Sequence, residues 1–128
     1  MQNRTKAKKK AKITARRKTS LAWAAAEAKK GLEPVILRVG RLTSVAEFFF
    51  ICSAANERQV RAITEEIDAS LSRAGCDPLR MEGRSRWRWV VLDYGDVLIH
   101  IFLEEIRRLY SLEKLWGDAP RVYPKKRT

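Results

Sequence analysis

The sequence predicts a single α/β domain with a mixed sheet and flanking helices, and three observations lead to this prediction. The chain has 128 residues, which suffices for one modest core. Two apolar runs, at 34–40 and 47–54, have the length of strands. An alanine-rich stretch and a stretch with apolar residues at helical spacing indicate helices beside them. The predicted order is helix, strand, strand, helix, three strands, helix.

The first predicted helix contains the stretch LAWAAAEAKK, which is rich in alanine, the best helix former. Thr19 or Ser20 can cap it, because a side-chain oxygen at that position accepts a hydrogen bond from the first turn. Lys29 and Lys30 lie in its last turn, where the helix dipole favours cations, and Gly31 ends it.

Two strands are predicted to follow as a hairpin-like pair. PVILRVG starts at Pro34, where proline is tolerated because the first residue of a strand needs no ladder hydrogen bond. RLTSVA is a turn, and EFFFICSA is a more continuously apolar strand that suits the interior of the sheet.

The second helix has a clear beginning and end. Asn56 caps it, with Gln59 three residues later in the capping-box position, and Gly75 ends it. Its apolar face consists of Val60, Ile63, Ile67 and Leu71.

The later strands come from PLRMEG, WRWVVLDY and DVLIHIF, with the last two joined by a tight turn at Tyr94 and Gly95. Trp87 and Trp89 are two positions apart and are predicted to share one face of a strand. EEIRRLYSLEKLWGDAP has apolar spacing compatible with one or two final short helices.

All of the excess positive charge lies at the two ends of the sequence. Residues 1–18 carry nine Lys or Arg and no acidic residue, and 125–127 add three basic residues. The remaining 15 basic residues are balanced by 15 acidic ones, although the net charge of the chain is +12. Such a block of like charges cannot pack a core. We expect a disordered basic extension at 1–18, one globular domain at 19–124 and a short basic tail at 125–128.

Two roles stay open for the basic extension. Its charge density favours salt-sensitive contact with RNA, and the candidate residues are Lys8, Lys9, Lys10, Lys12, Arg16, Arg17 and Lys18. The alternative is a solvated tail that only keeps the protein in solution.

The composition predicts a soluble, cytosolic protein without membrane contact. No apolar run approaches the roughly 18 residues of a membrane-spanning helix, and the lysine-rich start lacks the apolar block of a secretion signal. Cys52 and Cys76 have neither CxxC spacing nor histidine neighbours, so we expect reduced, structural cysteines and no metal.

The stretch VVLDYGDVLIH is the candidate for catalysis, because it holds Asp93, Asp96 and the only histidine, His100. Two carboxylates three positions apart across a turn are poorly placed to converge on a cation. A histidine flanked by apolar strand residues is typical of a hydrogen-bonded structural group. With no phosphate loop, nucleophile set or zinc set present, the sequence predicts no catalytic residue and no cofactor. Weak metal-dependent chemistry at the two aspartates is the alternative.

A binding surface is the other interpretation of the same region. If the tryptophan face is partly open, then Trp89, Tyr94 and Glu82 form the aromatic and charged cluster typical of a protein interface. The alternative is that both indoles belong to the core. The pattern favours a binding module but names no partner.

Five motifs follow one another at specific spacing: SVAEFFFICSA, RQVRAI, PLRMEG, WVVLDYGDVLIHIF and EEIRRLYSLEKLWGDAP. Together they resemble the ribosomal silencing factor family, also called the Iojap-related family, from about Thr19 to Val122. The resemblance implies a five-stranded mixed sheet with flanking helices, similar to a nucleotidyltransferase-like fold without its catalytic set. The basic extension lies outside the usual family core, so the resemblance implies nothing about it.

The resemblance also implies a function. Members bind the large ribosomal subunit through the ribosomal protein conventionally numbered fourteen and sterically prevent the small subunit from joining, which represses translation. Some members are homodimers when free of the ribosome. The alternatives are an RNA-binding ribosome assembly factor and a degenerate metal-dependent nucleotidyltransferase.

Carried over to this sequence, the contact surface for the ribosomal protein consists of Glu82, Gly83, Trp89, Asp93, Tyr94, Gly95 and Asp96. The two aromatic residues would be amphipathic anchors, and the carboxylates would face basic groups of the partner. For Asp93 and Gly95 the alternative is that they only shape the turn. Arg84, Arg86 and Arg88 replace a more acidic stretch of the family, which changes the expected charge of this rim.

Overall fold

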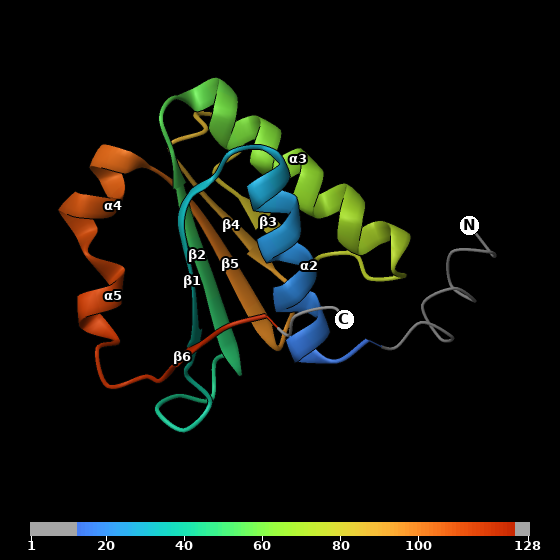
Figure 1. The fold of residues 1–128 in the computed structure, drawn as a ribbon, viewed down its shortest axis with the longest axis vertical. Coiled ribbons are helices and arrows are strands. Elements are labelled where there is room, and N and C mark those ends of the chain that lie inside the picture. The colour runs from blue at the N-terminus through green and yellow to red at the C-terminus, as the bar shows by residue number, and fades with distance from the viewer. Residues whose placement is uncertain (1–12, 125–128) are drawn as a thin grey trace.

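The computed structural model describes residues 13–124, which form a six-stranded sheet with helices on both faces (Figure 1). The helices are α2 (Ala15–Ala28), α3 (Glu57–Arg73), α4 (Glu104–Tyr110) and α5 (Leu112–Leu115). The strands are β1 (Leu32–Arg38), β2 (Phe48–Ala54), β3 (Arg80–Glu82), β4 (Trp89–Asp93), β5 (Val97–Leu103) and β6 (Arg121–Val122). Within 13–124, no helix is long and apolar enough to cross a membrane.

The strand order is β3-β4-β5-β2-β1-β6. β2 and β5 pair in parallel along their length, and the other neighbours are antiparallel. The predicted mixed α/β class is therefore confirmed, with six strands in place of five. The additional strand is β6, which pairs with β1 through Val122 opposite Ile36. Two residues are too few to show a strand period in the sequence. The likeness to a nucleotidyltransferase fold stays a prediction.

Each face of the sheet carries its own buried cluster. α2 and α3 lie on one face, and α4 and α5 lie on the other (Figure 1). All seven residues of β2 are buried, as expected for the continuously apolar strand, because β2 contributes side chains to both clusters. The cluster on the side of α4 and α5 consists of Val35, Leu37, Val39, Ala46, Phe49, Ile51, Phe102 and Ala119.

The first helix begins earlier than predicted. α2 starts at Ala15, and the Thr14 hydroxyl accepts a hydrogen bond from the backbone N–H of Arg17 at 3.0 Å. Thr19 is buried inside the helix, so the predicted cap at Thr19 or Ser20 is wrong. The expected disorder is also wrong for residues 13–18, because arginine and lysine are good helix formers and one side of this turn packs on the fold. Residues 1–12 and 125–128 lie outside the described part of the chain.

The second helix begins as predicted. Asn56 Oδ1 accepts from the backbone N–H of Gln59 at 2.9 Å, and Gln59 Oε1 accepts from that of Ala55 at 2.8 Å. The amide nitrogen of Gln59 also donates to the carbonyl oxygens of Lys29 and Lys30. Gln59 therefore joins the start of α3 to the end of α2.

Trp87 and Trp89 lie on opposite faces of the sheet, so their predicted shared face is wrong. Trp87 precedes β4 and has φ of 58°, and its backbone N–H donates to the carbonyl oxygen of Gly83 at 3.0 Å. Its ring packs against the helix side, with the Arg61 guanidinium of α3 5.4 Å from the ring centroid. A left-handed backbone at this position breaks the strand alternation before Trp89.

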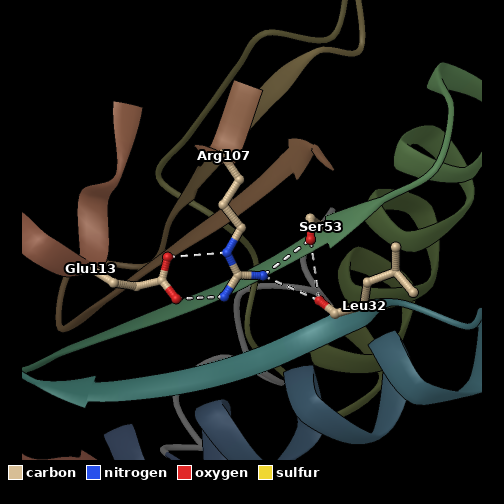
Figure 2. Close-up of polar contacts among 4 residues, drawn as sticks. All are labelled: Leu32, Ser53, Arg107 and Glu113. Carbon is tan, nitrogen blue, oxygen red and sulfur yellow. Dashed lines mark hydrogen bonds and ion pairs between the residues drawn. The ribbon is translucent and has the colours of Figure 1, made fainter. Parts of the chain in front are cut away.

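A buried arginine holds α4 and α5 on the sheet (Figure 2). Arg107 is 6% exposed, and its Nη1 donates to the carbonyl oxygen of Leu32 at 3.2 Å and to Ser53 Oγ at 3.1 Å. Its Nε and Nη2 donate to the two carboxylate oxygens of Glu113 at 3.1 and 2.7 Å. This guanidinium holds the pKa of the Glu113 carboxyl below its usual range. One side chain therefore joins both short helices to β1 and β2.

Candidate docking surface

Part of the sheet surface opposite α2 and α3 is left uncovered. α4 packs against β5 and β2, whereas the side chains of β3, β4 and the start of β5 border a shallow hollow of about 230 Å³. The lining residues of this hollow are Val45, Arg80, Glu82, Val91, Asp93 and Leu98. Together with the adjacent Trp89, these residues are called the open face.

Strand alternation explains the composition of the open face. Trp89, Val91 and Asp93 point to one side of β4, and Val90 and Leu92 point to the other, where they are buried. The neighbouring strand β3 places Glu82 opposite Val91 and Arg80 opposite Asp93. The result is an apolar strip with charged groups along its edge.

Among these charged groups, Arg80 Nη2 lies 3.5 Å from Asp93 Oδ2. Glu82 is exposed, and within residues 13–124 it takes part in no ion pair. The edge of the open face therefore presents one carboxylate paired with arginine and one that is accessible to a partner.

Trp89 borders the open face and also packs in the fold. Its ring centroid is 4.8 Å from that of Phe102 and 5.0 Å from that of Tyr110, and its Nε1–H donates to His100 Nδ1 at 3.2 Å. The residue is half-buried. The core interpretation and the interface interpretation of Trp89 therefore both apply. One part of the indole is buried in the fold, and the other part is exposed beside the open face.

His100 is a buried, hydrogen-bonded residue, as the sequence predicts. It lies on the same face of β5 as Phe102, with the Phe49 ring centroid 5.2 Å away. Its Nε2 has no hydrogen-bond partner in the described part of the chain. Burial lowers the pKa of His100 to about 4 from its usual value of 6.5.

This burial predicts a loss of stability in mild acid. The unfolded chain binds a proton at His100 near pH 6.5 and the folded chain only near pH 4, so stability decreases as pH falls between these values. We expect His100 to remove about 2 kcal/mol of stability between pH 7 and pH 5. Urea denaturation across this range measures it. His100→Asn keeps an acceptor for Trp89 without a titrating ring, and an unchanged pH profile in that variant would contradict the prediction.

The turn between β4 and β5 has the predicted form. The backbone N–H of Tyr94 donates to the carbonyl oxygen of Val97 at 2.9 Å, and that of Gly95 donates to Asp93 Oδ1 at 2.8 Å. Gly95 has φ of 87°, a conformation that glycine adopts without strain. Asp93 therefore shapes the turn and also lines the open face.

Two residues of the predicted contact surface lie elsewhere. Tyr94 is 5% exposed and belongs to the cluster under the helices, where burial raises the pKa of its phenol, so its role as an exposed anchor is corrected. Asp96 Oδ1 lies 2.7 Å from Lys18 Nζ of α2. Lys18 is itself buried by this contact and is removed from the candidate RNA contacts.

Asp93 and Asp96 do not converge on one point. Asp93 pairs with Arg80 on the open face, and Asp96 pairs with Lys18 on the helix side. Within residues 13–124, no group of three or more histidine, cysteine, aspartate and glutamate side chains could hold a metal ion. No disulfide bond joins Cys52 and Cys76, and burial raises the pKa of the Cys52 thiol to about 12.

Gly83 has a structural reason to be glycine. Its φ is 90°, and an added Cβ would overlap the carbonyl oxygen of Trp89 and lie 3.0 Å from its carbonyl carbon. The absence of a side chain lets the turn after β3 approach the first residue of β4. Gly83 therefore allows the segment that carries Glu82 to lie against the backbone of Trp89.

Several residues of the open face were not found from the sequence. Val91 and Leu98 could have been found, because strand alternation, which selected Trp89 and Asp93, also places these two residues on the open face. Val45 belongs to the loop between β1 and β2, where no periodicity predicts its position. Arg107 was overlooked because the sequence of α4 shows an arginine in a charged stretch and no sign of its burial.

A six-stranded sheet, covered by helices on one side and partly open on the other, defines a small α/β domain whose open face is a candidate docking surface. The model of one family, described as ribosomal silencing factor during starvation, matches residues 12–128. The chain belongs to the ribosomal silencing factor family.

Individual relatives agree with this assignment. The ribosomal silencing factor of Halalkalibacterium halodurans is 42% identical over 102 residues, 80% of this chain and 87% of the relative. A crystal structure of a Chromobacterium violaceum protein is similar with a TM-score of 0.80 and 30% identity, over 91% of this chain and 92% of that one. The Mus musculus protein named mitochondrial assembly of ribosomal large subunit protein 1 is 33% identical over 73 residues, 55% of this chain and 32% of its own.

Proposed function

We propose that this protein binds the large ribosomal subunit through one of its proteins and thereby prevents the small subunit from joining. The open face is the observation that carries this proposal. It combines an apolar strip of Val45, Val91 and Leu98 with a half-buried tryptophan, and carboxylates lie at its edge. Protein interfaces have this arrangement of an apolar centre, aromatic anchors and a polar rim. Family membership supports the ribosome as the partner.

The contact residues of the proposal differ from those of the sequence prediction. Glu82, Trp89 and Asp93 remain, and the apolar strip is added. Gly83 and Gly95 are assigned to the backbone turns, while Tyr94 and Asp96 support the sheet from the other side. Glu82 is the carboxylate best placed for a basic group of a ribosomal protein, because Asp93 already has Arg80 as a partner. The mechanism is occlusion, which requires no chemical step.

Sedimentation of separated ribosomal subunits tests the proposal. The full chain is mixed with large and small subunits under conditions that allow joining, and its position and the fraction of joined ribosomes are followed. We expect co-migration with the large subunit and a decrease in joined ribosomes. Full joining in the presence of a saturating amount of protein would contradict the proposed block.

Val91→Glu tests whether the open face is the contact surface. Val91 belongs to the apolar strip that lines the hollow, and a carboxylate there would be desolvated by a docked partner. We expect affinity for the large subunit to fall about tenfold or more, which corresponds to about 1.4 kcal/mol. Equilibrium binding to purified large subunits, with thermal denaturation to verify the fold, measures this.

Ala69→Glu is the matched control, because it adds the same charge at an exposed position of α3 on the opposite side of the sheet. Its affinity should equal that of the unchanged chain. An equal loss of affinity in both variants would mean that the open face is not the contact surface for the large subunit.

An assembly role for the large subunit is the second candidate, and the name of the mouse relative favours it. Assembly and silencing differ in the particle that is bound. Co-migration with immature large-subunit particles but not with mature subunits would support assembly. A homodimer when free and a cytosolic location stay predictions.

A further inference from the structure

The hydrogen bond between Trp89 and His100 runs diagonally across two strands. Trp89 of β4 lies opposite Phe102 of β5, whereas its bonding partner lies opposite Val91, further along β4. The Nε1–H of Trp89 nevertheless reaches His100 Nδ1 at 3.2 Å. The indole therefore leans along its strand, and its nitrogen edge is turned toward Val91, which lines the hollow of the open face.

The His100 ring is held in place by aromatic rings of two strands. Phe49 of β2 lies edge-on to it, with 5.2 Å between the ring centroids. Phe102 of β5 is nearly parallel to it, with 11° between the ring planes and 6.0 Å between the centroids. Only 7% of His100 is exposed. Because packing locks this side chain, its Nδ1 is an acceptor with a fixed position.

The position of the proton on the imidazole follows from the bond to Trp89. Since Nδ1 accepts, the neutral ring carries its proton on Nε2. Nε2 is buried and has no hydrogen-bond partner in the part of the chain that the structure describes. A buried donor without a partner costs stability, and an apolar side chain of similar size would avoid this cost. Packing alone therefore does not explain a histidine at position 100, whereas the bond to Trp89 does.

The other contacts of Trp89 restrict its orientation less. The ring centroids of Phe102 and Tyr110 lie 4.8 and 5.0 Å away, and Tyr110 is itself exposed at the end of α4. Ring contacts of this kind are compatible with several relative orientations, whereas a hydrogen bond is directional. A tryptophan side chain has several staggered rotamers. The bond from Nε1 selects one of them.

We propose that His100 is a positioning residue of the open face, which holds the Trp89 indole in its docking orientation before a partner binds. An anchor that is already fixed loses less side-chain freedom on binding, and this raises affinity. Because His100 is almost fully buried, it acts through Trp89 and not by its own contact with a partner. The inference rests on the proposed function, in which Trp89 contacts the large ribosomal subunit.

The indole N–H signal of Trp89 in a proton–nitrogen NMR spectrum tests the positioning in the free chain. The chain has four tryptophans, and Trp89→Phe identifies the signal. At neutral pH, His100→Leu should shift this signal and speed its exchange with water, because the acceptor is lost. His100→Asn places an amide oxygen near the position of Nδ1 and should keep the slow exchange. An unchanged signal in His100→Leu would overturn the proposal.

Stability and affinity should respond to His100→Leu in different ways. The midpoint of urea denaturation at neutral pH should be equal to or higher than that of the unchanged chain, because the unpartnered Nε2–H is removed. Affinity for purified large subunits should nevertheless fall about tenfold, and His100→Asn should restore most of it. A lower midpoint with unchanged affinity is the result expected of a purely structural histidine, and it would overturn the proposal.

A double-mutant cycle tests whether His100 acts only through Trp89. Once Trp89→Phe has removed the indole, adding His100→Leu should not lower affinity further. A further tenfold loss in this background would mean that His100 acts elsewhere, which would overturn the proposal. Thr64→Val is the matched control, because it also replaces a buried polar side chain by an apolar one, but in α3 on the other face of the sheet. It should change neither the indole signal nor the affinity.

Failure of the proposed function would give a different result. If the unchanged chain does not bind the large subunit, the proposed function is wrong and the docking role of His100 is wrong with it. The indole signal then still shows whether His100 holds Trp89. If the unchanged chain binds and His100→Leu binds equally well, only the positioning role of His100 is wrong.

Discussion

Replacing Arg107 with methionine is expected to lower the free energy of unfolding by about 3–5 kcal/mol. Methionine can occupy much of the space of the aliphatic stem, but it cannot donate to Leu32, Ser53 or Glu113. The variant removes the arginine donor to the Ser53 hydroxyl and one of two donors to the Leu32 carbonyl oxygen, which keeps Ser53 Oγ at 3.4 Å, and it leaves a partly buried carboxylate without its paired arginine. Urea denaturation at neutral pH measures the effect.

Two further variants separate the charge from the packing at this site. Adding Glu113→Gln to Arg107→Met removes the uncompensated carboxylate and should recover part of the lost stability, with a coupling energy of about 0.5–3 kcal/mol. Arg108→Met is the control, because Arg108 is also an arginine of α4 with a carboxylate partner but is exposed. Its Nη1 lies 3.9 Å from Glu104 Oε2. Its cost should be about 1 kcal/mol or less. If Arg107→Met costs no more than this control, Arg107 does not hold the two short helices on the sheet.

Gly83→Ala is expected to lower stability by about 3 kcal/mol or more, which is large for a single methyl group. The new Cβ would overlap the carbonyl oxygen of Trp89, and alanine at φ of 90° is strained in addition. The backbone at this clash cannot rotate away as a flexible side chain could, so β3 must move from β4. Thermal denaturation measures the total cost, and amide hydrogen exchange in β3 measures the local separation.

Gly95→Ala separates the clash from the backbone strain. Gly95 has nearly the same φ, 87°, but an added Cβ would meet only Leu79 Cδ1 at an ordinary 3.5 Å. Its cost should be about 1 kcal/mol. A similar cost for both alanine variants would show that conformation alone explains the glycine at position 83. A larger cost for Gly83→Ala, with weaker binding to the large subunit, would mean that this glycine serves the open face by positioning β3.

Long elements with clear end signals could be predicted from the sequence. The second helix has a capping asparagine, a glutamine three positions later and four apolar residues at helical spacing, and the structure confirms its start at Glu57. The first two strands were also found, since their apolar runs are long enough to be distinguished from loops. The predicted start at Pro34 is wrong, because β1 begins at Leu32 and Pro34 lies where the pairing with β2 shifts its register, a position that tolerates proline. The turn at Tyr94 and Gly95 followed from glycine at a position that requires positive φ.

Elements decided by tertiary contacts could not be predicted. β6 exists because β1 offers an edge for two residues to pair with. The burial of Lys18 against Asp96 is a second such case, whereas the cap of α2 at Thr14 is a local signal that the prediction missed. The predicted face of Trp87 was wrong, because the pattern of apolar residues does not reveal a positive φ at a non-glycine residue.

The candidate site was predicted in part for the same reasons. Trp89, Glu82 and Asp93 were found by strand alternation and family resemblance, and they share one face. Tyr94 was predicted to be an exposed anchor because it lies in the turn and in the contact surface that the resemblance implies, but it continues the inward alternation of Val90 and Leu92. The apolar strip was overlooked because its exposure depends on where α4 ends. The sequence of β4 does not show how much of the strand α4 covers.

The position of β5 has a consequence for the order in which this protein can fold. β5 lies between β4 and β2, so the two halves of the sheet join only through the parallel pair that begins at Val97. During synthesis, β1, β2 and α3 leave the ribosome before that partner exists, and parallel pairing over a long loop is slow to form. Until then, β2 has an unpaired edge along a strand that is buried throughout in the finished domain. We therefore expect chains that stop before Val97 to aggregate, and the sheet to be completed only when most of the chain has been made.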